Sequence, residues 1–154
     1  MAAEAARPIG RDDLARAFER APALVERLAP DVPFASPEAA IARARAILDR
    51  MSEGERIAVL DAHPRIGADP RSMSEASRHE QGADGDPALL EELRELNERY
   101  ERRSGFRFVV FVAGRPRSAL VPVLRARLER TREEELATGV GEFLAIARDR
   151  LSAG

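Results

Sequence analysis

Histidine occurs only twice in this sequence, and one of the two, His63, directly precedes Pro64 at the end of an apolar segment. Histidine is the side chain that titrates near neutral pH, so His63 is a candidate acid–base group. The same residue also fits two structural roles, a helix cap or a packed side chain in the core. Which role it has depends on the groups that the rest of the chain brings to it.

A second candidate group lies in the stretch SRHEQ. Ser77, Glu80 and Gln81 are spaced i, i+3 and i+4, so a helix would present a hydroxyl, a carboxylate and an amide on one face. His79, the other histidine, points away from that face by the same geometry. The alternative is an ordinary surface helix whose polar face is solvated, because such spacings arise often by chance.

The third candidate is an apolar stretch of chain, FRFVVFV, which begins after Gly105 and is followed by a second glycine, Gly114. Its β-branched and aromatic residues favour an extended segment, although periodicity alone does not exclude a core helix. An isolated strand in a helical protein has no sheet neighbours for its N–H and C=O groups. These groups must bond to helix ends, water or a ligand, and we expect them to line a pocket for a planar polar molecule.

These three features together suit a small heterocyclic substrate and an enzyme without a cofactor. The sequence holds no phosphate-binding glycine motif, and it has no cysteine and two histidines, which argues against a structural metal site. The net charge of −2 and the pI near 5.8 do not favour nucleic acid. All 25 basic residues are arginine, so we treat the arginine runs as a composition bias. No apolar run reaches the roughly 18 residues of a membrane span, and we expect a cytoplasmic protein that binds no membrane.

The helix before His63 is well marked. Ser52 and Glu55 form a capping box at its start, and Pro64 forces the preceding residue out of the α region, so His63 lies at the helix exit. A second capping box, Ser72 with Glu75, predicts a short helix over 73–81, which carries the SRHEQ face.

The remaining elements are also helical, and they predict an all-α fold. We expect a single domain over residues 1–154, a compact multi-helix bundle with one short extended apolar segment near 106–113. The other expected helices are two short ones within 11–29 separated at Pro22, one with Ser36 as N-cap and Pro37 at its first position, one from Asp86 to Gly105, and two over about 118–130 and 131–151.

In their order along the chain, four motifs resemble the family of 2-oxo-4-hydroxy-4-carboxy-5-ureidoimidazoline (OHCU) decarboxylases. They are HP with a glycine-containing turn, SRHEQ, LNERY and GFRFVVFVAG, and the similarity runs from about Phe34 to Leu151. The resemblance implies an all-α carboxy-lyase that acts in urate breakdown, converts OHCU to (S)-allantoin and needs no cofactor or metal. It also implies a homodimer.

The resemblance assigns roles to single residues. The family's catalytic histidine falls on His63, and a substrate-contacting glutamate falls on Glu80. Our own hypothesis is that Glu80 is also catalytic, binding the ureido group or carrying a proton. The implied substrate-binding residues are Pro64, Ser77, Gln81, Phe108, Val109, Val110, Phe111 and Val112, the last five through their backbone groups.

Three residues depart from the family pattern. Ser104 replaces an aromatic residue, Arg107 stands where many members have proline, and Ala113 occupies a place often held by a basic residue. These differences leave open a decarboxylase of another ureide-like acid. The other alternative is a non-catalytic helical interaction module, in which His63 caps a helix and the SRHEQ face is solvated. In that module His63 and Glu80 would lie far apart.

Overall fold

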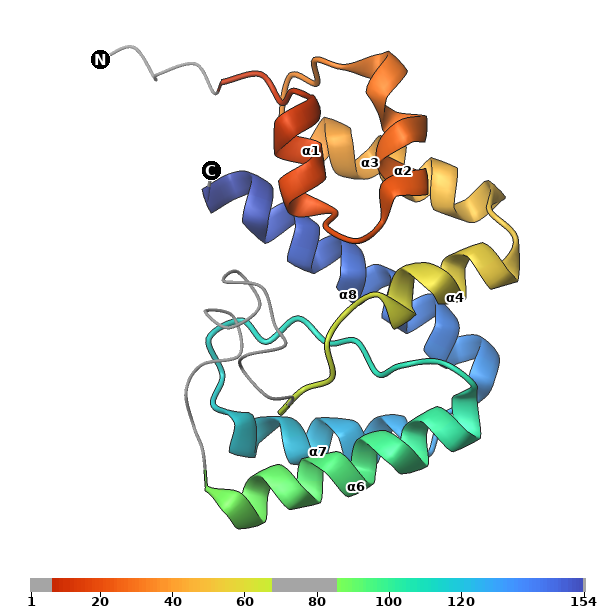
Figure 1. Ribbon diagram of the computed structural model, residues 1–154, viewed down its shortest axis with the longest axis vertical. Helices are drawn as coiled ribbons and strands as arrows, with labels where there is room; N and C mark the ends of the chain where they lie inside the picture. The colour runs from red at the N-terminus through yellow and green to blue at the C-terminus, as the bar shows by residue number, and fades with distance from the viewer. Residues whose placement is uncertain (1–6, 68–85, 154) are drawn as a thin grey trace. The chain divides into compact units, whose positions relative to one another are not determined.

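The computed structural model describes residues 7–67 and 86–153 of the chain (Figure 1). The all-α prediction is confirmed, because the described residues form helices and one isolated bridge between Ile9 and Phe34 but no strand. None of the helices in these two ranges is long and apolar enough to cross a membrane. The elements are α1 (Arg11–Ala17), α2 (Pro22–Leu28), the short 3₁₀ helix η1 (Ala29–Asp31), α3 (Pro37–Arg50), α4 (Glu53–Asp61), α6 (Pro87–Ser104), α7 (Arg117–Arg127) and α8 (Arg132–Ala153).

The chain forms two compact units, and both α4 and α8 contribute to each of them. The first unit holds the residues up to Val59 together with those from Phe143 onward, and the second runs from Leu60 to Glu142. All the residues proposed for the site have numbers within the second unit. The prediction that residues 1–154 form one domain stays a prediction.

The first unit consists of helices around an apolar core, and two of these helices begin at the residues that the sequence predicts. Proline at position 22 begins α2, as predicted, and Ser36 Oγ accepts a hydrogen bond from Ala39 N at 3.1 Å to cap α3. Phe18 packs against Phe143 with ring centroids 5.7 Å apart. The large, fully buried side chains of this unit also include Leu14, Leu24, Leu28 and Leu48.

The second unit contains α6 and α7 side by side, and the chain that joins them, residues 105–116, includes the 106–112 segment (Figure 1). Asp86 accepts from Ala88 N at 3.0 Å at the start of α6, and Gly105, with φ of 82°, ends this helix. Both features agree with the sequence. The helix α7 ends at Arg127 rather than near 130, a difference of a few residues, and helix ends are the least sharply defined part of a helix.

The next helix begins as the sequence predicts. A capping box joins Thr131 and Glu134, with both reciprocal hydrogen bonds at 3.1 Å, and α8 follows it from Arg132. The short helix predicted over 73–81 lies outside the described residues.

Candidate active site

His63 lies just past the end of α4, as the sequence predicted. The helix ends at Asp61, and His63 N donates to Leu60 O at 3.1 Å, which closes one further turn. Pro64 then prevents the helix from continuing. The His63 side chain is buried, with 8% of the residue exposed. An imidazole is therefore held in a largely dry environment at the exit of a short helix.

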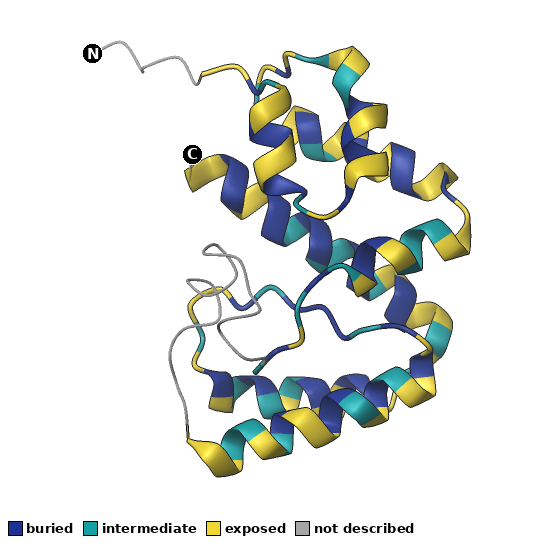
Figure 2. Cartoon of the chain, in the orientation of Figure 1, coloured by how far each residue is buried: buried dark blue, intermediate teal, exposed yellow. Residues whose placement is uncertain are grey.

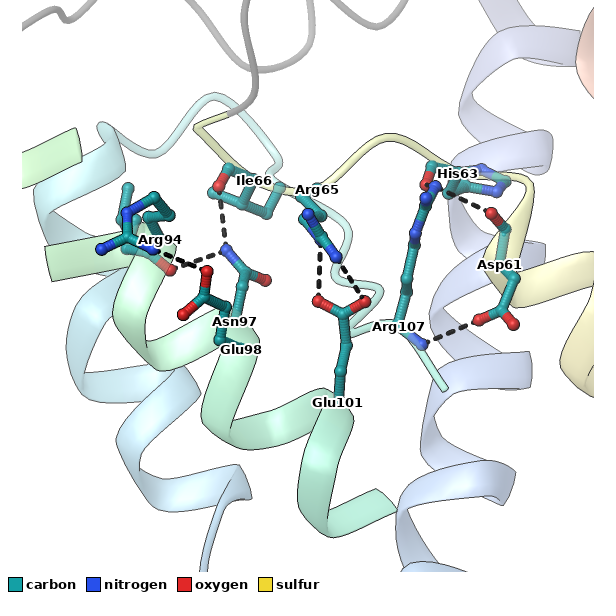
Figure 3. A network of polar contacts seen from close by, with 10 residues as sticks. Asp61, His63, Arg65, Ile66, Arg94, Asn97, Glu98, Glu101 and Arg107 are labelled. Atoms are coloured by element: carbon teal, nitrogen blue, oxygen red, sulfur yellow. Dashed lines mark hydrogen bonds and ion pairs between the residues drawn. The ribbon is translucent and has the colours of Figure 1, made fainter. Parts of the chain in front are cut away.

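The loop after His63 is fixed to α6 by polar side chains (Figure 3). The buried Asn97 side chain donates to Ile66 O at 3.0 Å and to Leu93 O at 2.8 Å. Arg65 forms a two-point ion pair with Glu101, with N···O distances of 2.7 and 2.9 Å. The pKa of Arg65 is raised, chiefly by its hydrogen bond to Glu101. The loop thus has a defined path along α6.

Gly67 ends the described part of this loop in a left-handed conformation, with φ of 84°. A Cβ atom there would lie 3.4 Å from a methyl group of Leu93 and 3.6 Å from one of Leu90. The positive φ therefore favours glycine at this position, whereas a Cβ atom would be in ordinary van der Waals contact with α6.

Arg107 connects the His63 loop to the chain that follows α6 (Figure 3). Its Nη1 donates to Asp61 O and to His63 O, both at 2.8 Å. Its backbone N donates to Asp61 Oδ1 at 2.9 Å. Proline at this position would supply none of these donors.

The segment over 106–112 has no helix, so the core-helix alternative is wrong and the prediction of a non-helical apolar segment is confirmed. Figure 2 shows most of it as buried, and Phe108, Val109 and Val110 are each no more than 3% exposed. The Phe108 ring meets Tyr100 edge-on at 5.3 Å between centroids. Left-handed residues flank the segment, namely Gly105, Ala113 and Gly114.

Arginine side chains satisfy part of the segment's backbone. Arg127 Nη1 donates to Val109 O at 2.7 Å. Arg115 turns back on the chain and donates to Phe111 O at 2.6 Å and to Val112 O at 2.9 Å. The backbone groups of Phe108 and Val110 form no hydrogen bond with the described residues.

A buried ionic cluster contacts the 106–112 segment. Glu135, 1% exposed, accepts hydrogen bonds from Arg127 Nε at 2.7 Å and from Tyr100 Oη at 2.6 Å. The Arg127 guanidinium also lies over the Phe108 ring, 4.4 Å from its centroid. Burial, followed by the hydrogen bond to Glu135, raises the pKa of Tyr100 well above its usual range, so this phenol stays a donor.

The structure places some of the predicted site residues and leaves others undescribed. His63 and the 106–112 segment lie in the same unit and are linked through Arg107. Ser77, Glu80 and Gln81 lie outside the described residues, so the prediction that they share a cavity with His63 stays a prediction.

Sequence reasoning missed the residues that hold this arrangement together. Asn97 and Tyr100 belong to the LNERY motif, which carried the family resemblance but was given no role at the site. Helical spacing predicts only that Tyr100 packs inward, and it is fully buried. A buried polar residue on the apolar face of a helix was the available indication for Asn97. The arginines at 115 and 127 had no indication, because every basic residue in the chain is an arginine, and Arg107 stood out only as a departure from the family pattern.

Comparison with known protein families gives one match that spans nearly the whole chain. The family model described as OHCU decarboxylase matches residues 7–152.

Two relatives illustrate this match. The uric acid degradation bifunctional protein PucL of Bacillus subtilis is 33% identical over 145 residues, which cover 92% of this chain. The chain spans only 29% of that relative's length. The 2-oxo-4-hydroxy-4-carboxy-5-ureidoimidazoline decarboxylase of Haloferax volcanii is 28% identical, and the match covers 92% of this chain and 86% of the relative.

A solved structure has the same fold. It is a crystal structure of OHCU decarboxylase in the presence of (S)-allantoin, and it matches with a TM-score of 0.74 at 23% identity. The match covers 92% of this chain and 96% of that one. At this level of identity the likeness concerns the fold alone.

Proposed function

The chain belongs to the OHCU decarboxylase family, a family of carboxy-lyases, and from that premise we propose that it converts OHCU to (S)-allantoin in urate degradation. The observation that carries the proposal is the match of the family model across residues 7–152.

The substrate itself makes the reaction accessible. Its carboxylate is attached to a carbon next to a ring C=N bond, so the electron pair left by CO2 is absorbed by the imine. The protein must hold the carboxylate out of the ring plane, stabilise the developing charge and deliver a proton to one face. Positioning of this kind contributes as much as about 7–11 kcal/mol in well-oriented cases.

His63 is the proposed acid–base group. It contacts the leaving carboxylate or the neighbouring hydroxyl, and its burial strengthens any electrostatic interaction with the substrate. The rigid loop around it supports this role. The N–H of His63 bonds to Leu60 O and its C=O accepts from Arg107, so the backbone that carries the imidazole is held at both sides of the residue.

The 106–112 segment is the proposed recognition element for the ring edge. Phe108 and Val110 have backbone groups that bond to no described residue, and the adjacent carbonyls of Val109 and Phe111 are already taken by arginines. A planar ring with N–H and C=O groups matches such a segment. The apolar side chains, including Val112, exclude water from it.

The remaining roles fall on residues beyond the described part of the chain, apart from Pro64, which fixes the backbone of His63. Glu80 binds the ureido N–H groups or carries the proton. Ser77 and Gln81 fix the ring and ureido oxygens.

The test is a direct assay of the product's handedness. OHCU is generated in situ and (S)-allantoin is followed by circular dichroism with and without the protein, because the substrate also decays unaided. We expect His63→Asn to remove the acceleration over the spontaneous rate and Glu80→Gln to reduce it. A His63→Asn variant with full activity excludes His63 as the acid–base group. An unaffected rate in Glu80→Gln removes Glu80 from the mechanism.

The active form is proposed to be a homodimer in the cytoplasm, as the family resemblance implies. Light scattering after size-exclusion chromatography measures the mass directly, and a monomer mass of about 16.9 kDa at assay concentration would exclude the dimer. Fractionation of cells that express the chain tests its location.

A further inference from the structure

We propose that Arg107 is a positioning residue for His63, an inference that rests on the proposed function because it takes His63 as the acid–base group. Arg107 comes 44 residues after His63, yet one guanidinium nitrogen bonds both His63 O and Asp61 O at 2.8 Å (Figure 3). Together with the bond from Arg107 N to Asp61 Oδ1, this gives three contacts between the two chain segments. We call these three contacts the Arg107 clasp.

The clasp forms where the backbone needs donors. Helix α4 ends at Asp61, and the last carbonyls of a helix have no partners within it. An arginine near a helix C-terminus satisfies such carbonyls, and its positive charge is favourable against the negative end of the helix dipole. Arg107 therefore fits this place in both hydrogen bonding and charge.

The clasp restrains His63 more closely than an ordinary cap does. His63 N is already bonded to Leu60 O, and Pro64 limits the backbone angles of His63 from the other side. The bond from Arg107 fixes the remaining polar group of the His63 backbone. The direction in which the imidazole leaves the main chain is thereby set before substrate binds, which is the condition for efficient acid–base catalysis.

The clasp also fixes His63 relative to the segment that lines the proposed site. Arg107 is the second residue of that segment, between Phe106 and Phe108. These two residues are 2% and 1% exposed, and their rings pack on Tyr100. A shift of the segment by one residue would remove the guanidinium from His63 O. The distance between the imidazole and the backbone of Phe108 is therefore set by the same contacts.

Substitution of Arg107 tests the role, with Arg125 as the matched control. Arg125 lies on α7 and pairs with Glu92 at 2.6 Å, so Arg125→Ala also removes an arginine–carboxylate contact but leaves the clasp intact. We expect Arg107→Ala to lower kcat by about ten-fold or more, since a small misplacement of a catalytic group is costly. Arg107→Lys, which keeps the charge and the backbone N–H but loses the fork, should recover part of kcat. Arg125→Ala should keep kcat within about two-fold of the unmodified protein.

A second readout separates positioning from stability. In a His79→Ala background the imidazole NMR signals come from His63 alone, because the chain has two histidines. We expect one narrow set of signals in this background, broadened or doubled signals with Arg107→Ala added, and no change with Arg125→Ala. A helix cap that only stabilises α4 would lower the unfolding midpoint and leave the His63 signals of the folded protein as they were.

Two results would overturn the proposal. One is an Arg107→Ala variant with kcat within about two-fold of the unmodified protein. The other is a loss of kcat with unchanged His63 signals. If Arg107→Ala does not fold, the same NMR comparison is made with Arg107→Lys. Unchanged His63 signals in that variant also overturn the proposal. The NMR experiment needs no substrate, so it still tests the role of Arg107 if the unmodified protein fails to accelerate OHCU decarboxylation, a failure that concerns the proposed function alone.

Discussion

The loop over 62–67 and the segment over 106–112 both follow a helix and contain no helix of their own, yet they are held in different ways. The loop is held largely by side chains that reach it from outside, namely Asn97 and Glu101 on α6 and the Arg107 clasp. The segment is held by its own buried side chains, and arginines occupy carbonyls on its backbone.

The difference shows how a helical protein accommodates irregular chain in its interior. Buried backbone groups without partners are costly, and neither stretch has a sheet neighbour among residues 7–67 and 86–153. Both stretches receive guanidinium donors, from Arg107 in the loop and from Arg115 and Arg127 in the segment. The planar fork of arginine can bond more than one carbonyl at once, as Arg107 does.

The largest expected loss of stability comes from removing Arg127, which supports the 106–112 segment. Arg127→Met leaves the Glu135 carboxylate buried without its closest cation, and the loss of one partner from a buried pair costs about 3–5 kcal/mol. Urea denaturation measures the change in the free energy of unfolding. Arg125→Met, on the same helix but in an exposed pair, is the control and should change it by less than about 0.5 kcal/mol. Equal changes in the free energy of unfolding for the two variants would show that the buried Arg127–Glu135 pair stabilises the protein no more than the exposed pair does.

A smaller effect is expected from the support of the loop. Asn97→Ala removes the side-chain donor of Ile66 O and Leu93 O, and a buried group left without a partner costs about 1–3 kcal/mol. Thermal unfolding and urea denaturation measure this loss, with the exposed Glu95→Ala on the same helix as control. If Asn97→Ala is as stable as that control, the polar attachment of the loop is not what holds it.

The smallest expected change in stability comes from a substitution at Ala113, which directly follows the 106–112 segment. Ala113 has φ of 54°, a left-handed conformation that costs a residue with a Cβ atom about 1–2 kcal/mol. Ala113→Gly relieves that strain but adds freedom to the unfolded chain, so we expect a net stabilisation of roughly 0.5 kcal/mol. A loss of stability on this substitution, measured by urea denaturation, would mean that the Ala113 methyl group makes contacts worth more than the strain.

The sequence predicted the elements whose causes are local. His63 at a helix exit follows from the Ser52–Glu55 capping box and from Pro64, and the capping box is present with both bonds at 3.1 Å. The non-helical segment follows from its β-branched and aromatic residues. Each of these predictions depends on residues a few positions apart, which is the range that a sequence pattern reports.

The supports of the site were beyond that range. Arg107 and His63 are 44 residues apart, and Asn97 and Ile66 are 31 apart, so no local pattern connects them. The arginines were also treated as a composition bias, because the chain uses no lysine. That interpretation was too broad, since Arg107, Arg115 and Arg127 each donate to carbonyls of the loop or the segment.

A crystal structure of this protein with (S)-allantoin tests the central claim most directly, because it asks whether two differently supported stretches of chain meet on one small molecule. We expect the ligand to lie within hydrogen-bonding distance of the His63 imidazole and of the backbone of Phe108 or Val110. Allantoin bound away from both, or contacting only exposed side chains, would contradict the claim.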